Sequence, residues 1–200
     1  QEVDDVKTLM NRSAVDFRKG NYQASYDEIK NAIALTDQIE NRMQEQVYFD
    51  AVNELLAQLD DCFKKFDMVL AKDPTFLKQL IEQPNGLAGA VHLSGKMNPN
   101  DFKDAVKDIY LRTIHLKPPK SQEATHEQVV LTMKYALVAA ENFQKLYILD
   151  QVSLQDAYGI VDTAFNQIDQ AKKLRAQVQL GLIDPQARSK VIRADKIVNY

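Results

Sequence analysis

The sequence predicts an all-α fold, an elongated bundle of about six or seven helices, several of them long and coiled-coil-like. Glycine and proline number only six each among 200 residues, which is too few for a strand-rich fold. Ala, Leu, Gln, Lys and Glu, which favour helices, are abundant. Apolar residues recur in steps of three and four, the period of one helix face. We expect a single elongated helical domain over 1–200.

The first elements are a helix over 2–19 and a turn at Gly20 and Asn21. The segment 22–72 then contains neither Gly nor Pro. Because Asp37 with Glu40 has the spacing of a capping box, this segment is either one helix of roughly 75 Å or two helices with a bend near Thr36. Its apolar residues form two stripes that we predict to be buried: Tyr22, Tyr26, Ile29 and Ile33, then Val52, Leu55, Leu59, Cys62, Phe66 and Val69.

The middle of the chain is the least helical part. Asp73 and Pro74 form a good helix start, and that short helix stops by Pro84. An irregular Gly- and Pro-containing loop is predicted over 83–99. Its apolar side chains either pack inward or contact a partner, and they are Leu87, Val91, Leu93 and Met97.

Four further helices follow, with short connections that predict antiparallel neighbours. The first is capped by Asn98 or Asn100 and runs to about 116, where a break at 118–120 includes two prolines. The next two span about 121–149 and 153–181, with Gly181 as the end, and the last starts at Asp184 and Pro185. The predicted core positions are Val129, Met133, Ala136, Ala140, Phe143, Tyr147, Leu154, Ala157, Val161, Ala164, Ile168, Ala171 and Val178.

Composition narrows the function. Apolar residues make up 45% and charged residues 26%, which suits a protein with a real core. The net charge of −3 argues against a nucleic-acid partner. No apolar run has the length of a transmembrane segment. The single cysteine, Cys62, cannot form an internal disulfide, and its place on an apolar stripe indicates a small buried hydrophobe.

Motifs for catalysis are weak. The loop from Gly86 to Gly89 lacks the Gly-Lys-Ser/Thr ending of a phosphate-binding loop. Glu123 and His126 have the Glu-x-x-His spacing of di-iron bundles, but a di-iron site needs two such motifs and two more glutamates. We therefore predict no catalytic residues, no metal site, no cofactor and no enzymatic activity.

Charge is unevenly distributed. Residues 171–200 contain seven basic and two acidic residues, a net charge of +5 that leaves −8 for the remainder. This segment is either a solvated helix face or a docking surface for an acidic partner or a second copy. The partner-binding candidates are Lys172, Lys173, Arg175, Arg188, Lys190 and Arg193.

Residues 13–35 resemble one helical hairpin of the tetratricopeptide family. The family pattern places small residues where two helices approach, an aromatic residue three places before a turn glycine, and Tyr after it. The matching residues are Ser13, Phe17, Gly20, Tyr22, Ser25 and Ala32. Arg12 and Asp37 depart from the pattern, and no second copy follows at the 34-residue period, so the resemblance implies one hairpin and not a repeat array.

The whole pattern also resembles the exported flagellar coiling proteins that coat the periplasmic flagellar filament of spirochaetes. The shared features are the hairpin, the very long helices, the lack of an active-site motif and the start at Gln1. This start reflects either a trimmed tag or signal-peptide removal, and we favour the second interpretation. The resemblance implies filament or sheath subunits as partners and a periplasmic or otherwise exported location, with the cytoplasm as the alternative.

Together these observations predict a non-catalytic structural or assembly protein that acts through protein–protein surfaces. The alternative is a helical adaptor or chaperone that holds a peptide or client protein in a groove, using the hairpin and the Gly-containing loop.

Overall fold

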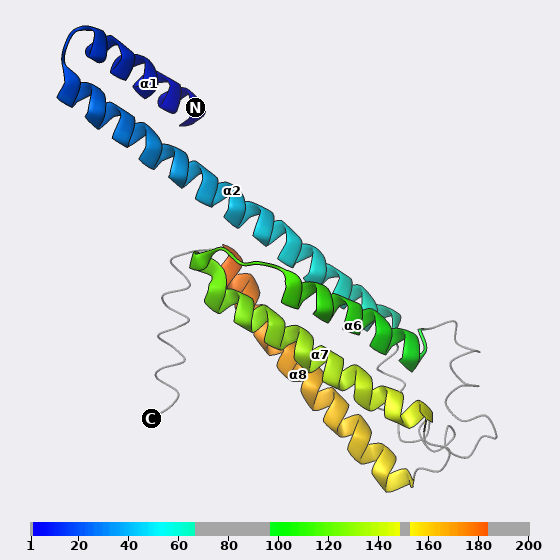
Figure 1. Ribbon diagram of the computed structural model, residues 1–200. Helices are drawn as coiled ribbons and strands as arrows, with labels where there is room; N and C mark the ends of the chain where they lie inside the picture. Colours follow the sequence, from blue (N-terminus) through cyan, green and yellow to red (C-terminus); the bar gives the residue numbers. More distant parts are fainter. Residues whose placement is uncertain (1, 67–96, 149–152, 184–200) are drawn as a thin grey trace, which may run out of the picture. The chain divides into compact units, whose positions relative to one another are not determined.

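The computed structural model describes residues 2–66, 97–148 and 153–183 (Figure 1). The described part is all-α and contains no strand. Its elements are α1 (Glu2–Arg18), α2 (Tyr22–Lys65), α6 (Pro99–His115), the 3₁₀ turn η1 (Lys120–Gln122), α7 (Glu123–Ile148) and α8 (Leu154–Ile183). The contacts divide the chain into two compact units, Gln1–Phe49 and Asp50–Tyr200, and α2 runs through both.

The first unit is a helical hairpin of α1 and the first part of α2. Gly20 has a φ of +80°, a left-handed conformation that glycine adopts without steric cost, and it turns the chain between the two helices. Ser13 of α1 and Ser25 of α2 are in contact, with their hydroxyl oxygens 2.9 Å apart. Ala32, another small residue of the predicted pattern, is also buried.

Helix α2 is continuous through Thr36. The Thr36 hydroxyl donates a hydrogen bond to the Ala32 carbonyl oxygen at 2.9 Å, one turn back along the same helix. The backbone is helical at Asp37, so this residue is no N-cap. Of the two alternatives for this segment, the structure shows one helix over the range that it describes.

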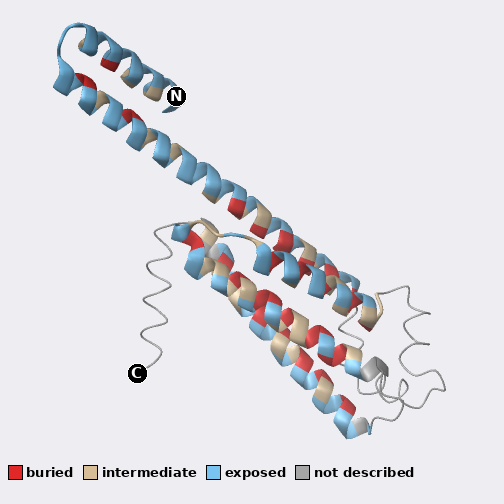
Figure 2. Ribbon diagram, in the orientation of Figure 1, coloured by how far each residue is buried: buried red, intermediate tan, exposed pale blue. Residues whose placement is uncertain are grey.

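The second unit contains the bundle core (Figure 2). Helix α7 packs along both α6 and α8, and the chain direction reverses at each step, as the short connections predict. The core positions predicted for the second unit are confirmed wherever their side chains are described. The buried residues among them are Val52, Leu55, Leu59, Cys62, Phe66, Val129, Met133, Ala136, Ala140, Phe143, Ala157, Val161, Ala164, Ile168, Ala171 and Val178.

Aromatic rings fill one part of this core. The rings of Phe66 and Phe102 stack with their centroids 4.3 Å apart, and Phe143 lies 4.9 Å from Phe66. Phe165 then meets Phe143 edge to face at 5.7 Å. These contacts join α6, α7 and α8 to the chain that follows α2, and such pairs stabilise by about 1 kcal/mol beyond their buried area.

The helix boundaries agree with most of the predicted signals. The Asn98 side chain accepts a hydrogen bond from the Asp101 amide at 2.9 Å, and Ser153 caps α8 through the Asp156 amide at 3.1 Å. Gly181 was expected to end the last described helix, and this expectation is wrong. Helix α8 continues to Ile183, because a glycine costs a helix only about 1 kcal/mol and does not by itself end it.

The described residues contain five α-helices, fewer than the six or seven predicted. The helices predicted from Asp73 and from Asp184 lie outside the described residues, as does most of the loop predicted over 83–99. The single elongated domain and the coiled-coil packing stay predictions.

Candidate functional site

The hairpin exposes many large apolar side chains. Two stripes form what we call the hairpin face. The stripe on α1 has three residues at intervals of seven, namely Val3, Met10 and Phe17. The stripe on α2 has four residues at intervals of four, three and four, namely Tyr22, Tyr26, Ile29 and Ile33. Phe17, Tyr22 and Tyr26 each expose more than 60% of their surface.

The prediction that the stripe from Tyr22 to Ile33 is buried is therefore wrong. Helix α1 covers the adjacent side of α2, where Ser25 and Ala32 lie, and leaves the stripe uncovered. Periodicity identifies which residues share a face, but it does not say whether the same chain covers that face. The stripe on α1 was not predicted as a site at all, although its seven-residue spacing is visible in the sequence.

The two stripes meet at a groove of about 450 Å³ on the hairpin. Met10 and Phe17 from α1 and Ile29 from α2 line it, together with Ser13, Ala14, Arg18 and Ser25. At the turn, the rings of Phe17 and Tyr22 meet edge to face with centroids 5.4 Å apart. The stripes therefore belong to one continuous surface on one side of the hairpin.

Few buried side chains stabilise the hairpin. The buried residues of the described part of the first unit are Ser13, Ser25, Ala32 and Tyr48, and of these only Tyr48 is large. Figure 2 shows the contrast, since red buried segments are sparse on α1 and the start of α2 and frequent on α7 and α8. Two helices that expose their apolar stripes gain little hydrophobic stabilisation from one another.

A surface of this kind suits binding and not covalent chemistry. Contiguous exposed apolar patches on soluble proteins mark interaction sites, and aromatic side chains are enriched at such sites. Apolar residues at steps of three and four in each of two adjacent helices form the surface that an amphipathic helix of a partner packs against.

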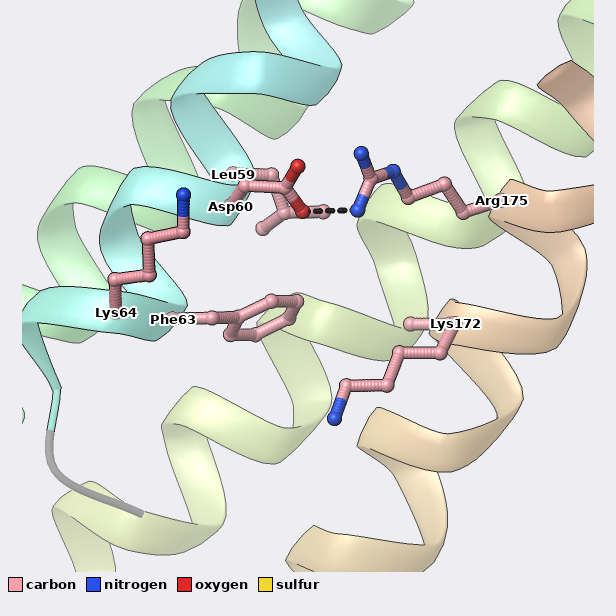
Figure 3. Close-up of a pocket in the computed structure, with 7 residues that line it drawn as sticks. Leu59, Asp60, Phe63, Lys64, Lys172 and Arg175 are labelled. Atoms are coloured by element: carbon pink, nitrogen blue, oxygen red, sulfur yellow. Dashed lines mark hydrogen bonds and ion pairs between the residues drawn. The ribbon is translucent and has the colours of Figure 1, made fainter.

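A second hollow lies between α2 and α8, within the second unit, and has a volume of about 340 Å³. Figure 3 shows Asp60 of α2 and Arg175 of α8 pointing toward one another, joined by an ion pair, with the ring of Phe63 nearby. Leu59 and Ala171 form its apolar part, and Lys64 and Lys172 complete the lining.

The predicted basic docking residues differ in their surroundings. Arg175 is largely covered and bonded to Asp60, so its main described role is to hold α8 against α2. Lys172 and Lys173 are exposed, so among the predicted docking residues that the structure describes, these two are accessible to a partner. Arg188, Lys190 and Arg193 lie outside the described residues.

Most of the predicted loop contact also lies outside the described residues, namely Leu87, Val91 and Leu93. Met97 is described and half-buried, and its backbone amide donates a hydrogen bond to the carbonyl oxygen of Lys65 at 3.2 Å. Met97 therefore adjoins the end of α2. The other three residues stay predictions.

Burial shifts the pKa values of two side chains considered in the sequence analysis, Cys62 and His126. Burial raises the pKa of the Cys62 thiol, and the Asp61 carboxylate adds to this effect. Burial lowers the pKa of His126 below its ordinary value of 6.5. Over the ranges that the structure describes, no three His, Cys, Asp or Glu side chains are grouped closely enough to hold a metal ion.

Comparisons with known proteins do not assign this chain to a family. No family model, no curated protein and no solved structure matches this chain. Within the described residues, no helix combines the length and the hydropathy that crossing a membrane requires.

Proposed function

We propose that this chain is a non-catalytic assembly protein that binds other proteins through the hairpin face. The observation that supports the proposal is the uncovered apolar surface formed by Met10, Phe17, Tyr22, Tyr26 and Ile29. Keeping such side chains in water forgoes about 25 cal/mol for each Å² of apolar surface. A partner that covers them recovers this free energy.

The sequence resemblance supplies a more specific form of the proposal. In this form, the protein is exported and belongs to the coat of a periplasmic flagellum, where it binds filament or sheath subunits. Cell fractionation tests the location, and co-sedimentation with isolated filaments tests the partner. Recovery of the protein in the cytoplasmic fraction would exclude the exported form of the proposal while leaving the hairpin face as a binding surface.

The groove lined by Met10, Phe17 and Ile29 favours one alternative, a helical adaptor or chaperone that holds a client segment. The two functions differ in what they bind. A chaperone delays aggregation of an unfolded client, whereas an assembly protein binds a folded filament and leaves the client's aggregation unchanged.

The hairpin face is tested directly by Tyr26→Glu combined with Ile33→Glu. Both side chains are more than half exposed, so the folded chain loses little packing and its helix content should stay unchanged. Partner binding should weaken at least tenfold, because a charge at the centre of an apolar contact is costly to desolvate.

A matched control is Val15→Glu on α1. Val15 is exposed to 42% but does not belong to the two stripes or to the groove. It introduces one glutamate into the same hairpin, where the double variant introduces two, and it should leave binding unchanged. Equal binding by the double variant, the control and the wild type would show that the hairpin face is not the contact.

The exposed α8 cations, Lys172 and Lys173, form a second proposed contact, with an acidic surface. Reversing both to Glu leaves the Asp60–Arg175 pair intact, so the fold is preserved. Binding should weaken, and more at low salt than at high salt, because the screening length falls as salt is added. Unchanged binding at both salt concentrations would make these residues a solvated face.

A further inference from the structure

We propose that the partner which covers the hairpin face is a second copy of this chain. Two hairpins would pack face to face and antiparallel, and together they would form a four-helix bundle. This inference rests on the proposed function, because it names the partner of the same surface.

The first support is that the α2 stripe is complementary to itself. Tyr22 and Ile29 are seven residues apart, and so are Tyr26 and Ile33, which is the repeat that side-by-side helices use. A two-fold axis midway between Tyr26 and Ile29 places Tyr22 opposite the partner's Ile33, and Tyr26 opposite the partner's Ile29. Each layer then pairs one aromatic ring with one branched aliphatic side chain, and the polar Thr36 lies beyond these layers.

The second support is the size of the surface. The seven side chains of the hairpin face are each about half exposed or more, and together they present roughly 700–900 Å². A specific protein–protein interface covers about 800 Å² on each partner. The hairpin face alone therefore provides the area that a stable dimer needs.

The third support is charge. Helix α1 begins with Glu2, Asp4 and Asp5 and ends with Arg18, which Lys19 follows. Antiparallel packing places the basic end of one α1 near the acidic start of the other, whereas parallel packing places like charges together. The charges therefore favour the same antiparallel direction as the stripe on α2.

The association is tested on the full chain by sedimentation equilibrium over a range of concentrations. The wild type should pass from a mass of 22.8 kDa toward twice that value as its concentration rises. Tyr26→Glu with Ile33→Glu should raise the dimer dissociation constant at least tenfold, and Val15→Glu should leave it within twofold of wild type. Circular dichroism of each variant establishes that the helices remain folded.

Cross-linking tests the direction and register. In a Cys62→Ala background, chains with Tyr22→Cys and chains with Ile33→Cys should form a disulfide-linked dimer when they are mixed and oxidised, because these positions face one another. Either chain alone should stay mostly uncrosslinked. Strong linkage of Tyr22→Cys to itself would overturn the antiparallel arrangement.

Two further outcomes separate this inference from the proposed function. A chain that stays monomeric at all concentrations, yet binds a different protein in a manner that Tyr26→Glu with Ile33→Glu abolishes, overturns the second copy and leaves the hairpin face as a binding surface. A dimer that is unaffected by the same double variant overturns this inference and places the contact elsewhere.

Discussion

Cys62 shows how the position of a residue in the bundle determines its chemistry. It is 6% exposed, and burial raises the pKa of its thiol. The Asp61 carboxylate raises it further, while Lys65 opposes the shift. The thiol therefore stays protonated near neutral pH, and a protonated thiol is a poor nucleophile and a poor metal ligand. Its role is to fill the core beside Leu59 and Phe66.

Replacing Cys62 by Ala should lower the free energy of unfolding by on the order of 1 kcal/mol, because only a small volume is removed from the core. Urea denaturation followed by circular dichroism measures the change. Partner binding should be preserved at temperatures where the variant is folded. A folded Cys62→Ala protein that no longer binds its partner would assign the thiol a direct functional role.

The helices and turns of this chain could be predicted where neighbouring residues alone determine the local structure. Gly20 and Asn21 predicted the turn between the first two helices, and the resemblance to a tetratricopeptide hairpin placed Ser13 and Ser25 where those helices approach. The core stripe of α2 from Val52 to Phe66 was predicted equally well. The stripe from Tyr22 to Ile33 has the same period but the opposite environment, since no local signal tells whether another helix of the same chain lies over it.

Gly20 supports a prediction at the level of the hairpin. Gly20→Ala should lower the free energy of unfolding by about 1 kcal/mol, because its φ of +80° is unfavourable for a residue with a β-carbon. The matched control is Gly159→Ala within α8, where an added β-carbon meets no atom within 4 Å.

The control substitution should instead raise the free energy of unfolding by about 0.5–1 kcal/mol, since alanine favours a helix over glycine. Denaturant unfolding of the two variants measures both effects. Equal shifts in the same direction would mean that backbone conformation does not distinguish the two glycines.

At the scale of the whole molecule, ion pairs and hydrogen bonds help to join helices that are far apart in the sequence. Asp60 and Arg175 connect α2 with α8, and Arg112 of α6 hydrogen-bonds to Gln58 of α2 at 2.7 Å. These contacts were not predicted, because charge counts along a sequence do not show which helix faces which. Arg175 therefore looked like a docking residue in the sequence, while its described partner belongs to the same chain.

Asp60→Asn should lower the free energy of unfolding by about 1–2 kcal/mol, since it leaves the largely covered Arg175 without its counter-charge. Adding Arg175→Met to Asp60→Asn should recover part of this loss, because it removes the uncompensated charge. A double-mutant cycle measures the coupling. A coupling near zero would show that the pair is as weak as most exposed salt bridges.

The sequence predicts a single elongated domain, and this prediction is tested on the whole chain in solution. A compact domain of 200 residues has a radius of gyration of about 16 Å. Small-angle X-ray scattering should give a larger value, and a value at or below this one would contradict the prediction.

Helix α2 belongs to both units of the chain, and this has a consequence for its backbone dynamics. Between Tyr22 and Phe49 it buries only Ser25, Ala32 and Tyr48, whereas the shorter part that follows buries Val52, Leu55, Leu56, Leu59 and Cys62. Backbone amides exchange their protons with solvent through local openings, and sparse packing makes such openings easier.

Deuterium uptake should therefore change along one unbroken helix, fast before about Phe49 and slow after it. If a second copy covers the hairpin, uptake between Tyr22 and Ile33 should slow as the protein concentration rises, because association protects only the closed form.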